Sequence, residues 1–310
     1  MDSGLVGQVA FVTCRESVEA LLVVGILYSW LNSNPLAQRG KGYLWGGVGA
    51  GFGLAAFLAY LLIAANDAFG EAGQNWFMFA LLFAAAFLIV QMALWMKEHG
   101  RSMKSNLQSG LEQSAESQNW WGVFALAAIA VAREGSETVV FLSGAFLGLN
   151  SASGYLSFGV GLAVGLGLAL ILFWALQAGS RFISWKWFFR VTEILLLFLG
   201  GALFMASLNN AFAALAPRIN PAWLDSALAW LNKTTSWYDL SAWIDDTRGF
   251  GGLMATMFGF RARPARLEIA AFLIYWAIAL SLLAWQNRRL SKRRNSGGSA
   301  PHLANKSSSA

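Results

Sequence analysis

The sequence predicts an all-α, polytopic membrane protein with seven transmembrane helices. Of its 310 residues, 57% are hydrophobic and only 12% are charged, and the mean hydropathy is +0.51. This composition is too apolar for an ordinary soluble domain, and it contains repeated apolar runs of about 20 residues, the length of a membrane-spanning helix. The loops between these runs alternate between basic segments and segments without lysine or arginine, which indicates repeated crossings.

Each apolar run is expected to form one span. The first has no basic segment before it and carries charges in its middle, so we interpret it as a permanent helix and not as a cleavable signal peptide. The polar stretch 97–119 is either an interfacial helix or a plain connector, and we favour the connector. The expected spans are Leu5–Leu31, Tyr43–Ala65, Trp76–Met96, Trp120–Leu149, Tyr155–Gln177, Phe188–Leu208 and Leu267–Trp285.

Basic residues in the short loops predict the orientation, because lysine and arginine accumulate on the cytoplasmic side. They occur after the first, third, fifth and seventh spans and are absent from the other short loops, so the N-terminus is expected outside and the C-terminus inside. The long segment 209–266 would be an outer loop. The cytoplasmic residues are Arg39, Lys41, Lys97, Arg101, Lys104, Arg181, Lys186, Arg190, Arg288, Arg289, Lys292, Arg293 and Arg294.

The C-terminal tail, residues 291–310, is rich in serine, glycine and basic residues and is expected to be disordered in the cytoplasm. Much of the net charge of +6 sits in this tail and in the inner loops. Such charges commonly face anionic lipid, so the bilayer is the expected partner and nucleic acid is not.

Two spans carry the same charged pattern in their middle. The first span contains Arg15-Glu16-Ser17-Val18-Glu19, and the fourth contains Arg133-Glu134-Gly135-Ser136-Glu137. A charge at the centre of a membrane helix costs roughly 3 kcal/mol even on a lenient scale, so these residues need a function. Because a helix advances about 100° per residue, the arginine and both glutamates of each copy project from one face.

The two copies lie in an internal repeat, residues 5–96 and 120–208. After each motif span, a Tyr-Leu pair opens the next span, which continues with glycines four residues apart: Gly49 and Gly53 in one half, Gly161 and Gly165 in the other. Such glycines indicate close helix packing. Since the first span starts outside and the fourth starts inside, the predicted architecture is a 3+3 inverted repeat with a site near the midplane and one extra helix.

Four carboxylates without a nearby histidine or cysteine are a hard-oxygen site, suited to a metal cation. The two histidines, His99 and His302, lie outside the spans, which argues against haem and typical zinc or copper sites. An arginine on each motif face keeps its glutamates ionised and leaves other oxygens free for a metal. No nucleotide-binding motif is present, and an enzyme is not expected.

The motifs resemble the R-E-G-L-E signature of the high-affinity iron permeases, the oxidase-coupled permeases of fungi and bacterial Efe-type permeases. The resemblance covers nearly the whole chain, including the segment from Trp237-Tyr238-Asp239 to Gly259-Phe260. It implies uptake of Fe²⁺ or Fe³⁺ across a bacterial inner membrane and a periplasmic protein that oxidises or delivers iron. Ser17, Val18 and Ser136 depart from the signature. The resemblance places the metal on Glu16, Glu19, Glu134 and Glu137.

Six further acids are candidate metal ligands along the path. Glu193, near the cytoplasmic start of the sixth span, is either an exit ligand or the ion-pair partner of Arg190. The others lie on the outer side, where they could attract cations or simply be solvated. They are Asp67, Glu71, Asp239, Asp245 and Asp246.

Two other functions fit the same residues. One is a proton-coupled transporter of another divalent metal, in which the glutamates relay protons. The other is a membrane sensor or scaffold whose buried ion pairs only order the helices; in lipid vesicles it would move no metal.

Overall fold

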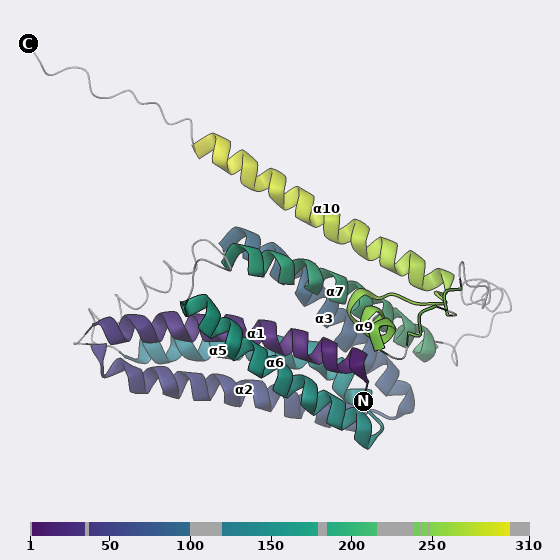
Figure 1. Ribbon diagram of the computed structural model, residues 1–310, viewed down its shortest axis with the longest axis horizontal. Helices are drawn as coiled ribbons and strands as arrows, with labels where there is room; N and C mark the ends of the chain where they lie inside the picture. The colour runs from purple at the N-terminus through teal and green to yellow at the C-terminus, as the bar shows by residue number, and fades with distance from the viewer. Residues whose placement is uncertain are drawn as a thin grey trace, which may run out of the picture.

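A computed structural model describes residues 2–34, 37–99, 120–178, 185–215, 239–241, 243–246 and 249–297. All the long elements in these ranges are α-helices (Figure 1). Every expected span is a helix; six of these helices extend beyond their predicted bounds, whereas α5 is slightly shorter than the expected span Trp120–Leu149. The helices are α1 (Ser3–Ser33), α2 (Gly40–Ala68), α3 (Glu71–His99), α5 (Trp121–Leu147), α6 (Ala152–Ala178), α7 (Trp185–Leu215), α9 (Gly249–Phe258) and α10 (Arg266–Gly297).

Five of the described helices, α2, α3, α6, α7 and α10, are long and apolar enough to cross a bilayer. The motif helices α1 and α5 are of similar length, with 31 and 27 residues, but carry the charged motifs in their middle. The carboxylate of Asp2 caps α1 by accepting from the amides of Gly4 and Leu5 at 2.9 and 3.2 Å. The chain is therefore an all-helical polytopic membrane protein.

The two halves of the chain exchange their second helices. α2, from the first half, packs along α5, and α6, from the second half, packs along α1 (Figure 1). The motif helices also contact each other, as do α3 and α7. Leu31 at the end of α1 and Trp120 before α5 both approach Gly40, so the two motif helices run in opposite directions. This antiparallel pairing brings the middle of one motif helix to the middle of the other.

Small residues make these pairings close, but those of α2 are not the ones expected. A Cβ on Gly51 would lie 2.7 Å from Val131 Cβ, and one on Gly165 would lie 2.7 Å from the carbonyl oxygen of Ala10. Gly49 and Gly53 have nothing within 4 Å, so their predicted role in packing is wrong. The Tyr-Leu alignment is displaced by two residues, and two residues turn a helix by about 200° to its opposite face.

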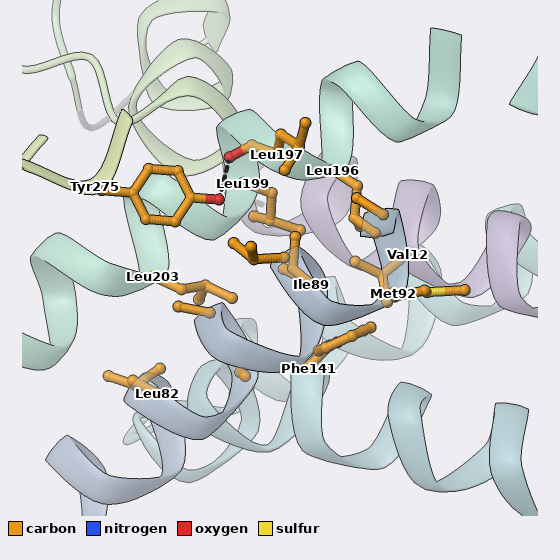
Figure 2. Close-up of a cluster of buried hydrophobic side chains, with 14 of the residues drawn as sticks. Val12, Leu82, Ile89, Met92, Phe141, Leu196, Leu197, Leu199, Leu203 and Tyr275 are labelled. Carbon is orange, nitrogen blue, oxygen red and sulfur yellow. Dashed lines mark hydrogen bonds between the residues drawn. The ribbon is translucent and has the colours of Figure 1, made fainter. Parts of the chain in front are cut away.

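A cluster of buried apolar side chains joins α3, α7 and α10 to the motif helices (Figure 2). Ile89 and Leu199 are fully buried, and Met92 of α3 and Phe141 of α5 also belong to this cluster. The Tyr275 hydroxyl of α10 donates to the carbonyl oxygen of Leu197 at 2.9 Å. α3 is thereby held between α7 and the two motif helices.

The segment between α7 and α10, which the sequence predicts to be an outer loop, contains an element that the sequence did not reveal. α9 packs against the start of α1, where Thr256 Oγ1 donates to the carbonyl oxygen of Gly4 at 3.2 Å. Left-handed glycines flank the helix, Gly249 with φ 56° and Gly259 with φ 69°. The expected outer loop also begins later than Asn209, because α7 continues to Leu215.

The C-terminal helix differs from its expected length. α10 continues to Gly297, so residues 291–297 are helical and do not belong to the expected disordered tail. Residues 298–310, the rest of that tail, lie outside the described part of the chain.

Candidate metal centre

Three motif glutamates meet where α1 crosses α5. Glu16 of α1 and Glu134 and Glu137 of α5 each offer one carboxylate oxygen, and these oxygens lie within 4.8 Å of one another. Glu16 is 1% exposed and Glu134 7% exposed, although both are charged residues. One oxygen of each of the three carboxylates has no hydrogen-bond partner. Three buried carboxylates this close together, each with one oxygen that lacks a hydrogen-bond partner, are suited to coordinate a hard cation.

Arg15 is buried and compensates the negative charge of the two glutamates of α1. Its Nη1 donates to Glu16 Oε1 at 2.5 Å, and its Nη2 lies 2.7 Å from Glu19 Oε1. The same two nitrogens approach thioethers of α3, Met92 Sδ at 3.2 Å and Met96 Sδ at 3.6 Å. The guanidinium is thus enclosed between its own helix and α3.

Arg133 makes a different environment for the second motif. Its Nε donates to Glu137 Oε1 at 3.1 Å and lies 4.0 Å from Glu134 Oε1. Its Cζ lies 4.0 Å from the centre of the Trp95 ring, a cation–π contact with α3. The side chain is 35% exposed, against 3% for that of Arg15. The two motifs match in sequence, but one arginine is sealed and the other is accessible.

The charges of the centre favour a cation. Two arginines face four glutamates, so ionised carboxylates leave a net negative charge inside the bundle. Each arginine occupies oxygens on its own helix, and the unpaired oxygens of Glu16, Glu134 and Glu137 remain available. A metal bridging them would neutralise the excess charge and join α1 to α5.

Glu19 is the fourth candidate ligand and lies outside this group of three. Its Oε1 faces Arg15, and it is 8% exposed. The structure therefore places Glu19 beside the three-carboxylate centre, as a partner of the arginine.

Neither Glu193 nor Asp67 belongs to the group of three carboxylates. Glu193 is half-buried on α7, within the electrostatic influence of Arg15, Lys97 and Arg190. Asp67 is exposed near the end of α2. Glu71 begins α3, but its side chain lies outside the described part of the structure.

Two of the outer aspartates hold the segment that leads to α10. Asp239 pairs with Arg263 at 3.0 Å, and this hydrogen bond lowers the pKa of Asp239 to about 2. Asp246 Oδ2 accepts from the amide of Ala262 at 2.9 Å. Asp245 is exposed and has a polar partner. All three acids are distant in sequence from the motifs, and Asp239 and Asp246 are occupied by the contacts named here.

Sequence reasoning missed the residues of α3 that touch the centre. Met92, Trp95 and Met96 share one helix face by their spacing of three and four residues, but that pattern is equally typical of a packed apolar face. Only the contacts with both arginines distinguish them.

Comparison with known proteins identifies the family of the chain. Residues 6–291 match the family model described as "Iron permease FTR1 family". The chain is 28% identical to "Ferrous iron permease EfeU" of Shigella sonnei (strain Ss046), over 87% of this chain and 92% of the relative. It is 28% identical to the protein of the same name from Escherichia coli O157:H7, with the same coverage. For the one from Yersinia pestis the identity is 26%, over 86% of this chain and 89% of the relative.

No solved structure matches the chain significantly. The bacterial relatives and the long apolar helices establish a multi-pass protein of the bacterial inner membrane. Because the family model covers nearly the whole sequence, including both charged motifs, the chain belongs to the iron permease FTR1 family.

Proposed function

We propose that this protein takes up iron across the inner membrane through the centre formed by its two motifs. The observation that carries the proposal is the close approach of the Glu16, Glu134 and Glu137 carboxylates, each with one unpaired oxygen, inside a membrane-spanning bundle. Carboxylate oxygens can coordinate iron in both oxidation states, and Fe³⁺ is the harder cation of the two. The description of the family suggests iron as the substrate, and the names of the bacterial relatives specify ferrous iron.

Seven spans accommodate this centre, with the N-terminus outside and the C-terminus inside. The charges of α1 are buried, and on α5 the glutamates are largely buried while the partly exposed Arg133 is paired with Glu137, so both helices can cross the bilayer with their charges compensated. Fusions of alkaline phosphatase after Gly70 and after Asn150 are expected to be active, and one after Asn34 inactive. Activity of the fusion after Asn34 would contradict the proposed orientation and indicate the opposite one.

Transport requires that the ion enter from one side and leave on the other. The exchanged packing gives two closely packed pairs, α1 with α6 and α5 with α2, and the candidate ligands are divided between them. Rocking of one pair against the other separates Glu16 from Glu134 and Glu137, and so weakens binding. Glu193, which lies within the electrostatic influence of Arg15, would receive the ion on the inner side.

The proposal is tested by iron uptake into vesicles that contain the purified protein. Glu16→Gln and Glu134→Gln should each lower uptake at limiting iron by about tenfold, which corresponds to about 1.4 kcal/mol of binding. Asp67→Asn, an exposed acid, is the control and should stay near the wild-type rate. Wild-type uptake in both glutamine variants would refute the site, provided that each variant reaches the membrane.

The same vesicles separate the alternatives. Anaerobic Fe²⁺ and chelated Fe³⁺, compared with Mn²⁺ and Zn²⁺, identify the transported ion, and a pH gradient shows whether protons drive the step. A transporter of another divalent metal would prefer Mn²⁺ or Zn²⁺ over iron. An oxidising or delivering periplasmic partner remains part of the proposal through the family resemblance alone, and co-purification from cross-linked membranes tests it.

A further inference from the structure

One turn of α3 contacts the guanidinium groups of both motif arginines. Met92 and Met96 approach Arg15, and Trp95 lies under Arg133. We propose that Met92, Trp95 and Met96 are positioning residues that hold both arginines away from the metal-facing oxygens of the glutamates. The proposal rests on the metal centre described above and adds a third element, outside the two motifs, to it.

The arginines need such a restraint because of their own chemistry. A guanidinium carries five N–H donors and readily binds both oxygens of one carboxylate. In the structure Arg15 contacts only Oε1 of Glu16, and Oε2 has no hydrogen-bond partner. If Arg15 turned to bind both oxygens, it would occupy the oxygen that a metal requires. The arginine must therefore stay close enough to balance charge while leaving that oxygen free.

The two thioethers meet this requirement for Arg15. A methionine sulfur is a weak, uncharged acceptor, so it can take a buried N–H without competing with the carboxylates for the positive charge. Met92 is 3% exposed and Arg15 2% exposed, so the sulfurs replace water at this face of the guanidinium. Leucine would keep the volume but leave the donors without a partner, and turning toward the glutamates would then become favourable.

Trp95 has the corresponding function for Arg133. Among the described side chains, Glu137 binds one part of this guanidinium and the indole face supports it. Because the side chain is 35% exposed, it has room to move if the ring is removed. Phenylalanine would retain an aromatic face for the cation, whereas leucine would not.

The methionine pair is tested by separating binding from turnover. In Met92→Leu/Met96→Leu, we expect the KM for iron uptake and the Kd for anaerobic Fe²⁺ to rise about tenfold or more, as for other residues that orient metal ligands. The maximal rate should stay within about threefold. Met78→Leu, about 20 Å away along the same helix, is the matched control and should change neither constant. An unchanged KM and Kd in the double variant, or a loss of maximal rate alone, would overturn the assignment.

The tryptophan is tested without iron, through the reaction of Arg133 with phenylglyoxal followed by peptide mass spectrometry. Trp95→Leu should raise the modification rate of Arg133 about fivefold, Trp95→Phe should stay near the wild-type rate, and so should Trp76→Leu on the same helix. Equal rates in all variants would refute the positioning role. If the wild-type protein bound no iron, the proposed function would fail, and this measurement would still decide whether Trp95 positions Arg133.

Discussion

Glu16 and Glu134 come from opposite halves of the chain, yet each places a carboxylate oxygen within 4.8 Å of the other. Their approach depends on the small residues that let the helices of the bundle pack closely. A Cβ on Gly135, the residue after Glu134, would lie 2.6 Å from Ala55 of α2. The glycine of the second motif therefore allows α5 to pack closely against α2. This packing leaves the glutamates of α5 directed toward α1.

The four motif glutamates should not be equivalent. Glu137→Gln removes a carboxylate from the group of three and is expected to raise the Kd for Fe²⁺ about tenfold. Glu19→Gln removes a partner of Arg15 outside that group, so we expect a smaller effect on the Kd. Equilibrium dialysis under anaerobic conditions measures both. A larger rise in Glu19→Gln than in Glu137→Gln would show that the resting geometry is not the binding geometry.

The two arginines should differ in their contribution to stability. Arg15→Met leaves Glu16 and Glu19 buried without their counter-charge, and breaking a buried pair in this way costs about 3–5 kcal/mol. Arg133→Met should cost less, because that side chain is partly exposed. Thermal unfolding in detergent should thus show a larger decrease in Tm for Arg15→Met.

A compensating variant tests the reason for that difference. If the uncompensated charge is responsible, Arg15→Met combined with Glu16→Gln and Glu19→Gln should recover most of the lost Tm while leaving iron binding abolished. A triple variant as unstable as Arg15→Met would assign the loss to packing of the arginine side chain and not to charge.

Most of the architecture was accessible from the sequence, because apolar length alone determines where a membrane helix can form. All seven expected spans are helices, and the i, i+4 pairs Arg15–Glu19 and Arg133–Glu137 formed as expected at 2.7 and 3.1 Å. The helix α9 was not predicted, since at 10 residues it is too short for a span. Some helices also end later than predicted: α10 continues to Gly297, because the polar residues after a span can continue its helix.

The details of the centre were less accessible, because they depend on which faces meet. The glycines of α2 were assigned two residues out of register, and nothing in the sequence distinguishes Gly47 and Gly51 from Gly49 and Gly53 before their neighbours are known. The motif spacing likewise did not show that Glu19 stands apart from the other three carboxylates.

The register of α2 yields a direct test. Gly51→Leu should prevent the close approach of α2 to α5 and lower the Tm strongly or abolish folded protein, since its Cβ would already lie 2.9 Å from the carbonyl oxygen of Ala128. Gly49→Leu points into open space and should be tolerated. Fluorescence-detected size exclusion and thermal unfolding compare the two. Equal damage by both substitutions would contradict the register.

The outer segment should respond to acid through Asp239. Its pKa of about 2 lies below the ordinary 3.8 because the Arg263 side chain and the hydroxyl and amide of Ser241 bond to the carboxylate. A carboxylate with a lowered pKa stabilises the folded form above its ordinary pKa, and this contribution is lost as the pH falls from about 4 toward 2. In the wild type, the Ser241 amide should therefore lose protection from hydrogen exchange over that interval.

Asp239→Asn removes the titrating group and separates this contact from general acid unfolding. Exchange at Ser241 should then be fast at every pH, after correction for the intrinsic rate, with no further step between pH 4 and 2. The Leu240 amide, which donates to the carbonyl oxygen of Ala262 at 3.0 Å, reports whether the rest of the segment stays in place. Because Asp239 is occupied by Arg263 and not directed into the metal centre, the variant should keep the wild-type Kd for Fe²⁺. A large rise in that Kd would instead assign Asp239 to the path of the metal.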